Sequence, residues 1–398
     1  MAGELNLNLD PMQFVNMAPS RKAAFEASTD TPLPADYPSN RLMRGLHPDF
    51  QYLIIDEVQD LCEGAKSYTL VPCAQDGTDS LAYFNAGQYI NVLLDIDGSK
   101  LYKPFSVCSS PDDALKKGRY VLTIKPSEDG FASTYILDAW KKGDRITTTG
   151  PEGTLTYEPL RDPKNVIGIA GGSGITPFYS LACAIAEGTE DFNLTVLYGS
   201  RKSDCILLKD EFDAIQAACD RVKVIHVLSE EENPDFEHGF ITAELIKKYA
   251  PDGDFALFVC GPQAMYEYVD PEIEKLSLPR RRVRHELFGQ INKPERFADY
   301  PQDCAEKVFT LNIQNRYEHI QVPCNASESL LVALERAGIA VPASCRSGEC
   351  GFCHTKLASG QVYIPPEKDN RRGADVKYGY IHPCISFPVS DVSLVLSV

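Results

Sequence analysis

Four cysteines near the end of the chain have the residue type and the spacing to hold a redox centre. Cys345, Cys350 and Cys353 follow the pattern C-x4-C-x2-C, and Cys384 comes later in the sequence. This spacing holds a [2Fe–2S] cluster through four thiolates, and such a cluster carries one electron at a time. The glycine and serine residues around the ligands let a loop wrap tightly, with backbone N–H groups directed at the sulfides. A zinc site or unligated thiols are the alternatives, although zinc more usually shows two C-x2-C pairs.

Length and composition indicate a soluble protein of two or three domains. The chain has 398 residues, of which 43% are hydrophobic and 24% are charged, as is ordinary for globular proteins. The formal net charge of −17 argues against nucleic acid as a partner and favours a basic protein. No signal-peptide pattern opens the sequence, and the cysteines suit a reducing compartment, so we expect a cytoplasmic location. The apolar stretch 165–186 is interrupted by glycines and by Pro177, so no membrane span is expected.

The pattern of apolar residues predicts a multidomain chain. Short alternating runs separated by Gly and Asp turns predict a β-barrel, and a later alternation of apolar strands with helices predicts an α/β domain with a parallel sheet. The expected parts are an N-terminal extension at 1–46, the barrel at 47–160, the α/β domain at 161–290, a linker at 291–306 and a small α+β domain at 307–398. Helices are expected at 11–27, 133–142, 177–187, 209–218, 243–249, 263–276 and 328–337.

Two segments of the predicted barrel have residues that suit a flavin. In Lys103-Pro104-Phe105-Ser106, the cation can meet a phosphate, the aromatic ring can pack on the isoalloxazine, and the hydroxyl can hydrogen-bond near N5. Gly130 to Ser133 opens the barrel helix, and the start of a helix offers N–H groups to a phosphate. An ordinary strand is the alternative for the first segment taken alone.

The α/β domain opens with a glycine-rich turn that is typical of a dinucleotide site. Residues 168–178, GIAGGSGITPF, read as strand, turn and helix start, although they depart from the G-x-G-x-x-G fingerprint. At the end of the following strand, Ser200, Arg201 and Lys202 favour the 2′-phosphate of NADPH, while Asp204 leaves NADH as an alternative.

A second strand-to-helix turn of this domain carries a cysteine. The segment CGPQAM at 260–265 places Cys260 at the carboxyl end of a strand, where the substrate crevice of such a sheet lies. A buried, inert thiol is the alternative.

These motifs together resemble the ferredoxin–NADP reductase superfamily. GQY at 87–89, KPFS at 103–106, GFAS at 130–133, GPEG at 150–153, GGSGITP at 171–177, CGPQAM at 260–265 and ELFG at 286–289 occur in that family's order. With a C-terminal plant-type ferredoxin domain, the chain is similar to reductases of the phthalate dioxygenase reductase type and of hybrid-cluster proteins over about residues 47–398. The fold implied is a flavin-binding barrel, an NAD(P)-binding parallel sheet and a β-grasp ferredoxin domain.

The resemblance implies roles for individual residues. Catalytic roles fall to Ser106, Cys260 and Glu286. Flavin contacts fall to Lys103, Pro104, Phe105, Ser106, Lys125, Gly130, Phe131, Ala132, Ser133 and Phe288. Nicotinamide-nucleotide contacts fall to Gly172, Ser173, Gly174, Thr176, Ser200, Arg201, Cys260, Gly261, Pro262 and Met265, and the cluster ligands are Cys345, Cys350, Cys353 and Cys384. Because the family's R-x-Y-S motif has Lys and Phe here, FMN stays open beside the expected FAD.

The activity implied is electron transfer from NADH or NADPH, through flavin and cluster, to a partner protein such as an oxygenase. Reverse transfer from a reduced ferredoxin, an electron-wiring subunit of a larger complex and a redox sensor acting through residues 1–46 are the alternatives. Lys368, Arg371, Arg372 and Lys377, on an otherwise acidic chain, form a candidate docking surface for the acceptor; a solvated loop is the alternative.

Overall fold

The structure is a computed structural model that describes residues 23, 26–28, 37–127, 130–204 and 206–396. The chain divides into two compact units, residues 1–44 and 45–398. Helix α2 (Pro38–Leu46) has no buried residue. The helix expected at 11–27 lies almost entirely outside the described residues.

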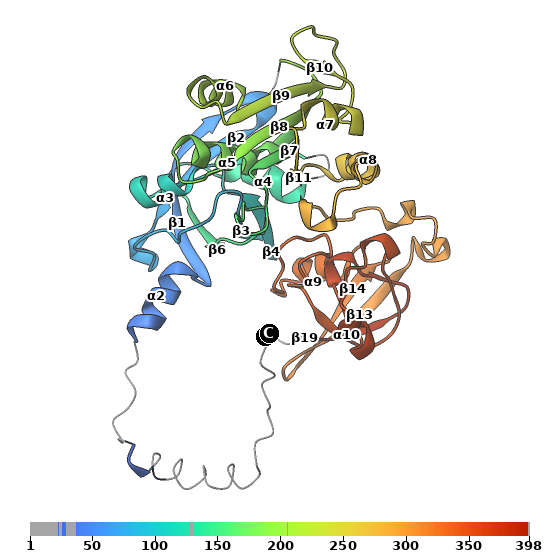
Figure 1. Cartoon of the computed structure of the whole chain (residues 1–398). Helices are drawn as coiled ribbons and strands as arrows, with labels where there is room; N and C mark the ends of the chain where they lie inside the picture. Colours follow the sequence, from blue (N-terminus) through green and yellow to red (C-terminus); the bar gives the residue numbers. More distant parts are fainter. Residues whose placement is uncertain (1–22, 24–25, 29–36, 128–129, 205, 397–398) are drawn as a thin grey trace. The chain divides into compact units, whose positions relative to one another are not determined.

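A curled antiparallel sheet forms the first part of the larger unit (Figure 1). Its strand order is β4-β3-β6-β1-β2-β5, and the two end strands contact one another. Alternate residues of β1 are buried, as a strand with one face on a core requires. The predicted barrel is therefore confirmed as a curled sheet. The elements are β1 (Phe50–Asp60), β2 (Lys66–Pro72), β3 (Tyr89–Ile96), β4 (Ser99–Ser106), α3 (Pro111–Lys117), β5 (Tyr120–Ile124), α4 (Phe131–Ala139) and β6 (Arg145–Thr149).

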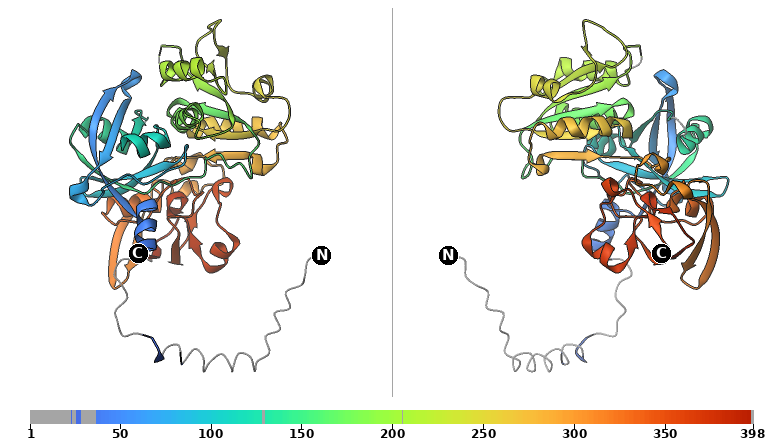
Figure 2. Two further views of the ribbon diagram at one scale, coloured as in Figure 1. Left: turned by 60° about the vertical axis from the view of Figure 1, so that its left-hand side comes forward. Right: turned by 90° about the vertical axis from the view of Figure 1, so that its right-hand side faces the viewer.

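A parallel sheet of order β10-β9-β8-β7-β11-β12 follows (Figure 2). Strand β11 is buried throughout, because helices pack on both faces of the sheet. The elements are β7 (Asn165–Gly171), α5 (Thr176–Ala186), β8 (Asn193–Ser200), α6 (Lys209–Ala218), β9 (Val222–Leu228), β10 (Glu237–His238), α7 (Ala243–Tyr249), β11 (Ala256–Cys260), α8 (Gln263–Glu274) and β12 (Val283–Glu286).

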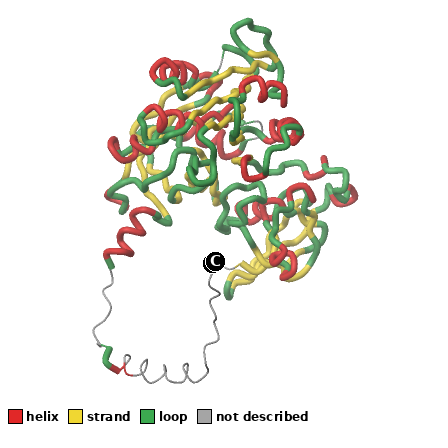
Figure 3. Tube along the Cα trace, viewed as in Figure 1, coloured by secondary structure: helices red, strands yellow, loops and turns green. Residues whose placement is uncertain are grey.

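The last part is a mixed sheet of order β14-β13-β19-β15-β17 with a helix packed on it (Figure 3). Strands β13 and β19 are parallel, and the other pairs are antiparallel. A small second sheet pairs β16 with β18. The elements are β13 (Val308–Asn315), β14 (Glu318–Asn325), α9 (Leu330–Arg336), β15 (Thr355–Ser359), β16 (Val362–Tyr363), α10 (Gly373–Tyr378), β17 (Tyr380–Ile381), β18 (Phe387–Pro388) and β19 (Val392–Leu396).

The segment 291–306, expected as a linker, packs against this last part of the chain. Tyr300 is buried, and its ring lies edge-on to that of Tyr363, with 5.1 Å between the ring centroids. The two rings and Phe387 form one apolar cluster, so the segment has a fixed place against the small sheet of β16 and β18. The domain boundaries given above remain predictions.

Candidate functional site

One cavity of about 1510 Å³ is lined by residues of the curled sheet, of the parallel sheet and of the loop that carries Cys345 in the last part of the chain. Every residue expected to contact a flavin and every residue expected to contact a nicotinamide nucleotide lines it. Of the four cluster cysteines, Cys345 lines the cavity, together with Arg346. The volume exceeds that of a usual single-ligand pocket, ~300–1,000 Å³. It can therefore take a flavin and a second nucleotide together.

Strand β4 builds one wall of the cavity. Lys103 and Phe105 alternate along it with Pro104 and Ser106, as period-two geometry requires. Burial, and then the neighbouring guanidinium of Arg346, lower the pKa of Lys103 to about 7. Two cationic side chains thus face one cavity, and an anionic group there would favour the charged lysine. This wall fits a ligand with a flat ring system and a phosphate.

The start of α4 requires glycine at one position. A Cβ on Gly130 would lie 2.0 Å from the Oγ of Ser127 and 2.3 Å from the Oγ of Ser133. The Ser133 hydroxyl donates to the carbonyl of Gly130 at 3.1 Å. The tight turn leaves the first-turn N–H groups of the helix without partners inside the helix, as a phosphate-binding turn needs.

The three residues expected to be catalytic lie together although the sequence separates them widely. Cys260 and Glu286 are register partners on β11 and β12, and the Ser106 hydroxyl donates to Oε2 of Glu286 at 3.3 Å. All three are buried. Burial raises the pKa of Glu286 to about 8, so this carboxyl group holds a proton at neutral pH. Ser106 and Cys260 line the cavity, and Glu286 lies behind Ser106.

The raised pKa of Glu286 predicts how stability depends on pH. The folded protein keeps this proton up to about pH 8, whereas the unfolded chain loses it near 4.5. The folded state binds more protons between these values, so the contribution of Glu286 to stability falls as pH rises, by at most about 1.4 kcal/mol per pH unit. We expect the thermal midpoint of Glu286→Gln to rise relative to the midpoint of the wild type as the pH increases from 5 to 8. The exposed Glu57→Gln is the control, and parallel wild-type and Glu286→Gln curves would contradict the assignment.

The turn between β7 and α5 packs directly on the turn between β11 and α8. A Cβ on Gly174 would lie 2.2 Å from the carbonyl oxygen of Cys260, and Gly172 has a φ of +53°. The hydroxyl of Tyr198 donates to the carbonyl of Gly172 at 3.0 Å. Close backbone approach and a left-handed residue both require glycine, which explains the glycine-rich sequence without the usual fingerprint.

The four cluster cysteines come together as two pairs. The Sγ atoms of Cys353 and Cys384 are 3.4 Å apart, and the thiols of Cys345 and Cys350 contact one another. Backbone N–H groups of Ser347 and Cys350 each donate to the Sγ of Cys345 at 3.4 Å. Over the described ranges, no three His, Cys, Asp or Glu side chains form a group around one ion. Two thiolates for each of two irons is the donor set of a [2Fe–2S] cluster, so these residues fit that group.

The cluster loop is hydrogen-bonded to the curled sheet. The hydroxyls of Tyr89 on β3 and Ser344 are 2.6 Å apart, and Ser344 donates to Oε2 of Glu152 at 2.9 Å. Asn91 donates to the same carboxylate oxygen at 3.2 Å. The sequence motifs contain Tyr89 and Glu152, but nothing in their spacing showed that Ser344, next to a cluster ligand, would bind both.

A buried ion pair fixes the cluster loop from the other side. Arg346 has a φ of +61° and places its guanidinium 2.5 and 2.7 Å from the carboxylate oxygens of Glu335 on α9. It also donates to the carbonyl of Tyr102 at 3.3 Å and to Gln290 at 2.9 Å. The side chains of Arg346 and Glu335 are only 4% and 5% exposed. Sequence reasoning missed this pair, although Arg346 lies between two of the predicted ligands.

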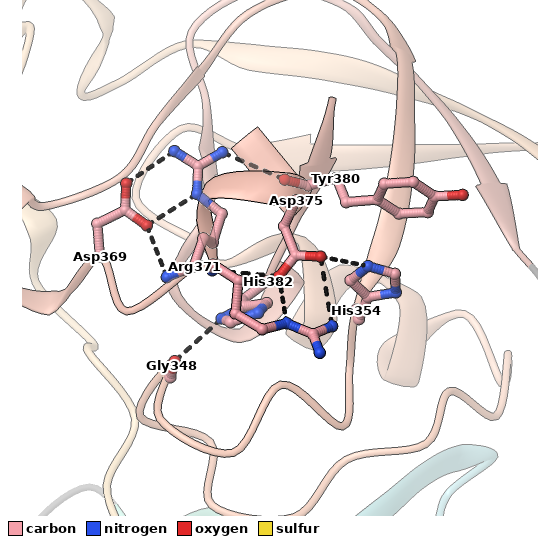
Figure 4. A network of polar contacts seen from close by, with 8 residues as sticks. Gly348, His354, Asp369, Arg371, Asp375, Tyr380 and His382 are labelled. Carbon is pink, nitrogen blue, oxygen red and sulfur yellow. Dashed lines mark hydrogen bonds and ion pairs between the residues drawn. The ribbon is translucent and has the colours of Figure 1, made fainter. Parts of the chain in front are cut away.

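A polar network holds the segment before Cys384 against the cluster loop (Figure 4). Arg371 binds Asp369 through two hydrogen bonds of 2.8 and 2.7 Å, and Arg372 pairs with Asp375 at 3.1 Å. Two further contacts reach the ligand loop: His354 to Asp375 at 3.1 Å and His382 to the carbonyl of Gly348 at 2.9 Å. Two of the four cations proposed to dock the acceptor, Arg371 and Arg372, therefore have structural partners. Acceptor docking at this surface remains a prediction.

Comparison with known proteins gives one consistent result. Family models match for the oxidoreductase FAD-binding domain (residues 55–157), the oxidoreductase NAD-binding domain (169–270) and the 2Fe-2S iron-sulfur cluster binding domain (313–389). The ferredoxin reductase component of 3-ketosteroid-9-alpha-monooxygenase from Mycobacterium tuberculosis is 30% identical, over 85% of this chain and 93% of its own length. The glycine betaine monooxygenase reductase subunit from Pseudomonas aeruginosa is 26% identical, over 78% and 87%.

A solved structure covers the whole architecture. Phthalate dioxygenase reductase, described as a modular structure for electron transfer from pyridine nucleotides to [2Fe-2S], superposes with a TM-score of 0.62 at 26% identity. It covers 88% of this chain and 98% of its own. Across the described part of the chain, no helix is both long and apolar enough to cross a membrane.

Proposed function

This chain belongs to the family of iron–sulfur flavoprotein reductases, and on that premise we propose that it oxidises NADH or NADPH and passes the electrons through FAD and its [2Fe–2S] cluster to an oxygenase component or another terminal redox protein. One observation carries the proposal: Phe105 and Ser106 of the flavin wall, Cys260 of the nucleotide wall and the cluster ligand Cys345 all face the same cavity. The nucleotide, the flavin and one ligand of the cluster can therefore share a single cavity.

Bound FAD supplies the exchange between a two-electron hydride and two single electrons. The chain's own residues bind the flavin and the nicotinamide nucleotide and orient them. Phe105 would offer its ring to the flavin, and Cys260 would help to orient the nicotinamide. Ser106 would offer its hydroxyl to the flavin from the cavity wall, and the protonated Glu286 behind it holds a proton within hydrogen-bond distance of that hydroxyl. These roles are part of the proposal.

The contacts of the cluster loop support direct electron transfer from the flavin wall. Ser344 is held by Tyr89 and Glu152, and Arg346 by the carbonyl of Tyr102. These contacts fix Cys345 at the cavity wall. We further propose a cytoplasmic location, because thiolates that hold a cluster stay reduced there.

The test is turnover by the purified chain alone. With NADH or NADPH and a one-electron acceptor such as cytochrome c, we expect two acceptor molecules to be reduced for each nucleotide oxidised. If turnover requires a second, copurifying chain, the wiring-subunit alternative replaces this proposal. If the protein forms NADH from a reduced ferredoxin but fails to reduce acceptors, the physiological direction is reversed.

A further inference from the structure

We propose that this reductase selects NADH over NADPH through Glu230, whose carboxylate pairs with Arg201 in the lining of the nucleotide cavity. The inference rests on the proposed function and names its substrate. It differs from the expectation drawn from the sequence, in which Ser200, Arg201 and Lys202 favoured the 2′-phosphate of NADPH.

The chain segments that follow β8 and β9 lie side by side at the carboxyl edge of the parallel sheet. The N–H of Ser229 donates to the carbonyl of Ser200 at 3.0 Å, and the N–H of Glu230 donates to the carbonyl of Arg201 at 3.0 Å. Ser200, Arg201 and Ser229 line the cavity. The end of the second strand in such sheets meets the adenosine ribose of a bound dinucleotide, so Glu230 stands beside the ribose position.

Two aromatic rings mark the same end of the cavity. Phe240 and Tyr268 both line it, with their ring centroids 5.0 Å apart. The two residues are 62% and 38% exposed. Exposed rings at the rim of a cavity offer a stacking surface to a planar base. The N–H of Gly239, next to Phe240, donates to the carbonyl of Leu228, next to Ser229, at 2.8 Å. An adenine stacked on Phe240 would therefore have its ribose near Ser229 and Arg201.

The charges at this position oppose a phosphate. The guanidinium Nε of Arg201 is 3.7 Å from Oε1 of Glu230. Glu231 follows, and it accepts hydrogen bonds from the N–H and the hydroxyl of Ser203 at 2.8 and 2.7 Å. These hydrogen bonds lower the pKa of Glu231 and keep it ionised.

Each nucleotide meets this pair of carboxylates differently. A 2′-phosphate would have to displace Glu230 from Arg201 and remain near the charge of Glu231, which Lys202 offsets only in part. The 2′-hydroxyl of NADH can instead donate a hydrogen bond to a carboxylate. The arrangement therefore favours the nucleotide without the phosphate.

The test compares both nucleotides on the purified holoenzyme. Anaerobic stopped-flow reduction of the flavin should give a higher kcat/KM for NADH than for NADPH. In Glu230→Gln, we expect kcat/KM for NADPH to rise by up to about fivefold, since Arg201 is released to bind the phosphate from an exposed pair that contributes at most about 1 kcal/mol. Glu232→Gln removes a neighbouring negative charge without the contact to Arg201, so it is the matched control and should shift the ratio far less.

Binding of nucleotide fragments gives a readout that does not depend on turnover. By calorimetry, 5′-AMP should bind the wild type more tightly than 2′,5′-ADP, and Glu230→Gln should reverse or abolish this order. A wild type that prefers NADPH, or a Glu230→Gln ratio equal to that of Glu232→Gln, overturns the inference and leaves the proposed function standing. Failure of both nucleotides to reduce the flavin overturns the proposed function as well.

Discussion

The Cys345→Ser variant should fail to deliver electrons to a protein acceptor, while NADH still reduces its flavin at the wild-type rate. Cys345 is a predicted cluster ligand and lines the cavity that the flavin wall faces, so its loss breaks the path after the flavin. The flavin and nucleotide walls come from the other two sheets and keep their contacts. Stopped-flow flavin reduction and steady-state cytochrome c reduction measure the two steps separately.

The matched control for this variant is Cys324→Ser. Cys324 is also buried in the ferredoxin-like sheet, but its thiol contacts backbone carbonyls of Asn325 and Glu328, not another thiol. This variant should keep both steps. An equal loss of both steps in Cys345→Ser, in protein that retains its flavin, would contradict the assignment of flavin reduction to the cavity walls and of electron delivery to the cluster.

Removing Glu335 should destabilise the cluster-bearing domain severely. In Glu335→Ala, the guanidinium of Arg346 stays buried without its carboxylate, and breaking a buried pair in this way costs about 3–5 kcal/mol. For a domain of this size, such a loss lowers the melting temperature by at least about 10 °C. Thermal unfolding followed through the absorbance of the cluster measures the effect.

Another glutamate–arginine pair of the same region provides the control. Glu328 binds Arg336 of α9 at 2.9 Å, but the Arg336 side chain is 45% exposed. Because partly exposed pairs contribute at most about 1 kcal/mol, Glu328→Ala should lower the midpoint far less than Glu335→Ala. Equal shifts in the two variants would show that Arg346 does not depend on Glu335.

Local sequence patterns predicted the parts of this structure that depend on neighbouring residues. The spacing of Cys345, Cys350 and Cys353 is a property of one loop, and the family model for the 2Fe-2S domain includes it. Helices α6 and α7 begin and end where expected, and the Thr242 side chain caps α7.

Contacts between distant segments could not be predicted in the same way. Glu286 was placed beside the flavin only through the family resemblance, and its bond to Ser106 joins residues from two different sheets. The pair between Arg346 and Glu335 depends on how α9 packs on the ferredoxin-like sheet. The two-residue strands β16, β17 and β18 are too short to produce an alternating pattern, so periodicity could not predict them.

The contact between Glu230 and Arg201 could not be predicted from the sequence for the same reason. Arg201 alone suggests NADPH in the sequence, because the residue that engages it follows a different strand. Only the register of β8 and β9 brings the two side chains together.

Anaerobic titration of the purified protein with NADH, followed by visible absorbance and low-temperature EPR, shows whether electrons pass from the flavin to the cluster. We expect bleaching of the flavin band together with the rhombic signal of a reduced [2Fe–2S] cluster. Bleaching of the flavin without that signal, in protein shown to contain iron and sulfide, would mean that the cluster is not the next carrier and would overturn the proposed electron path.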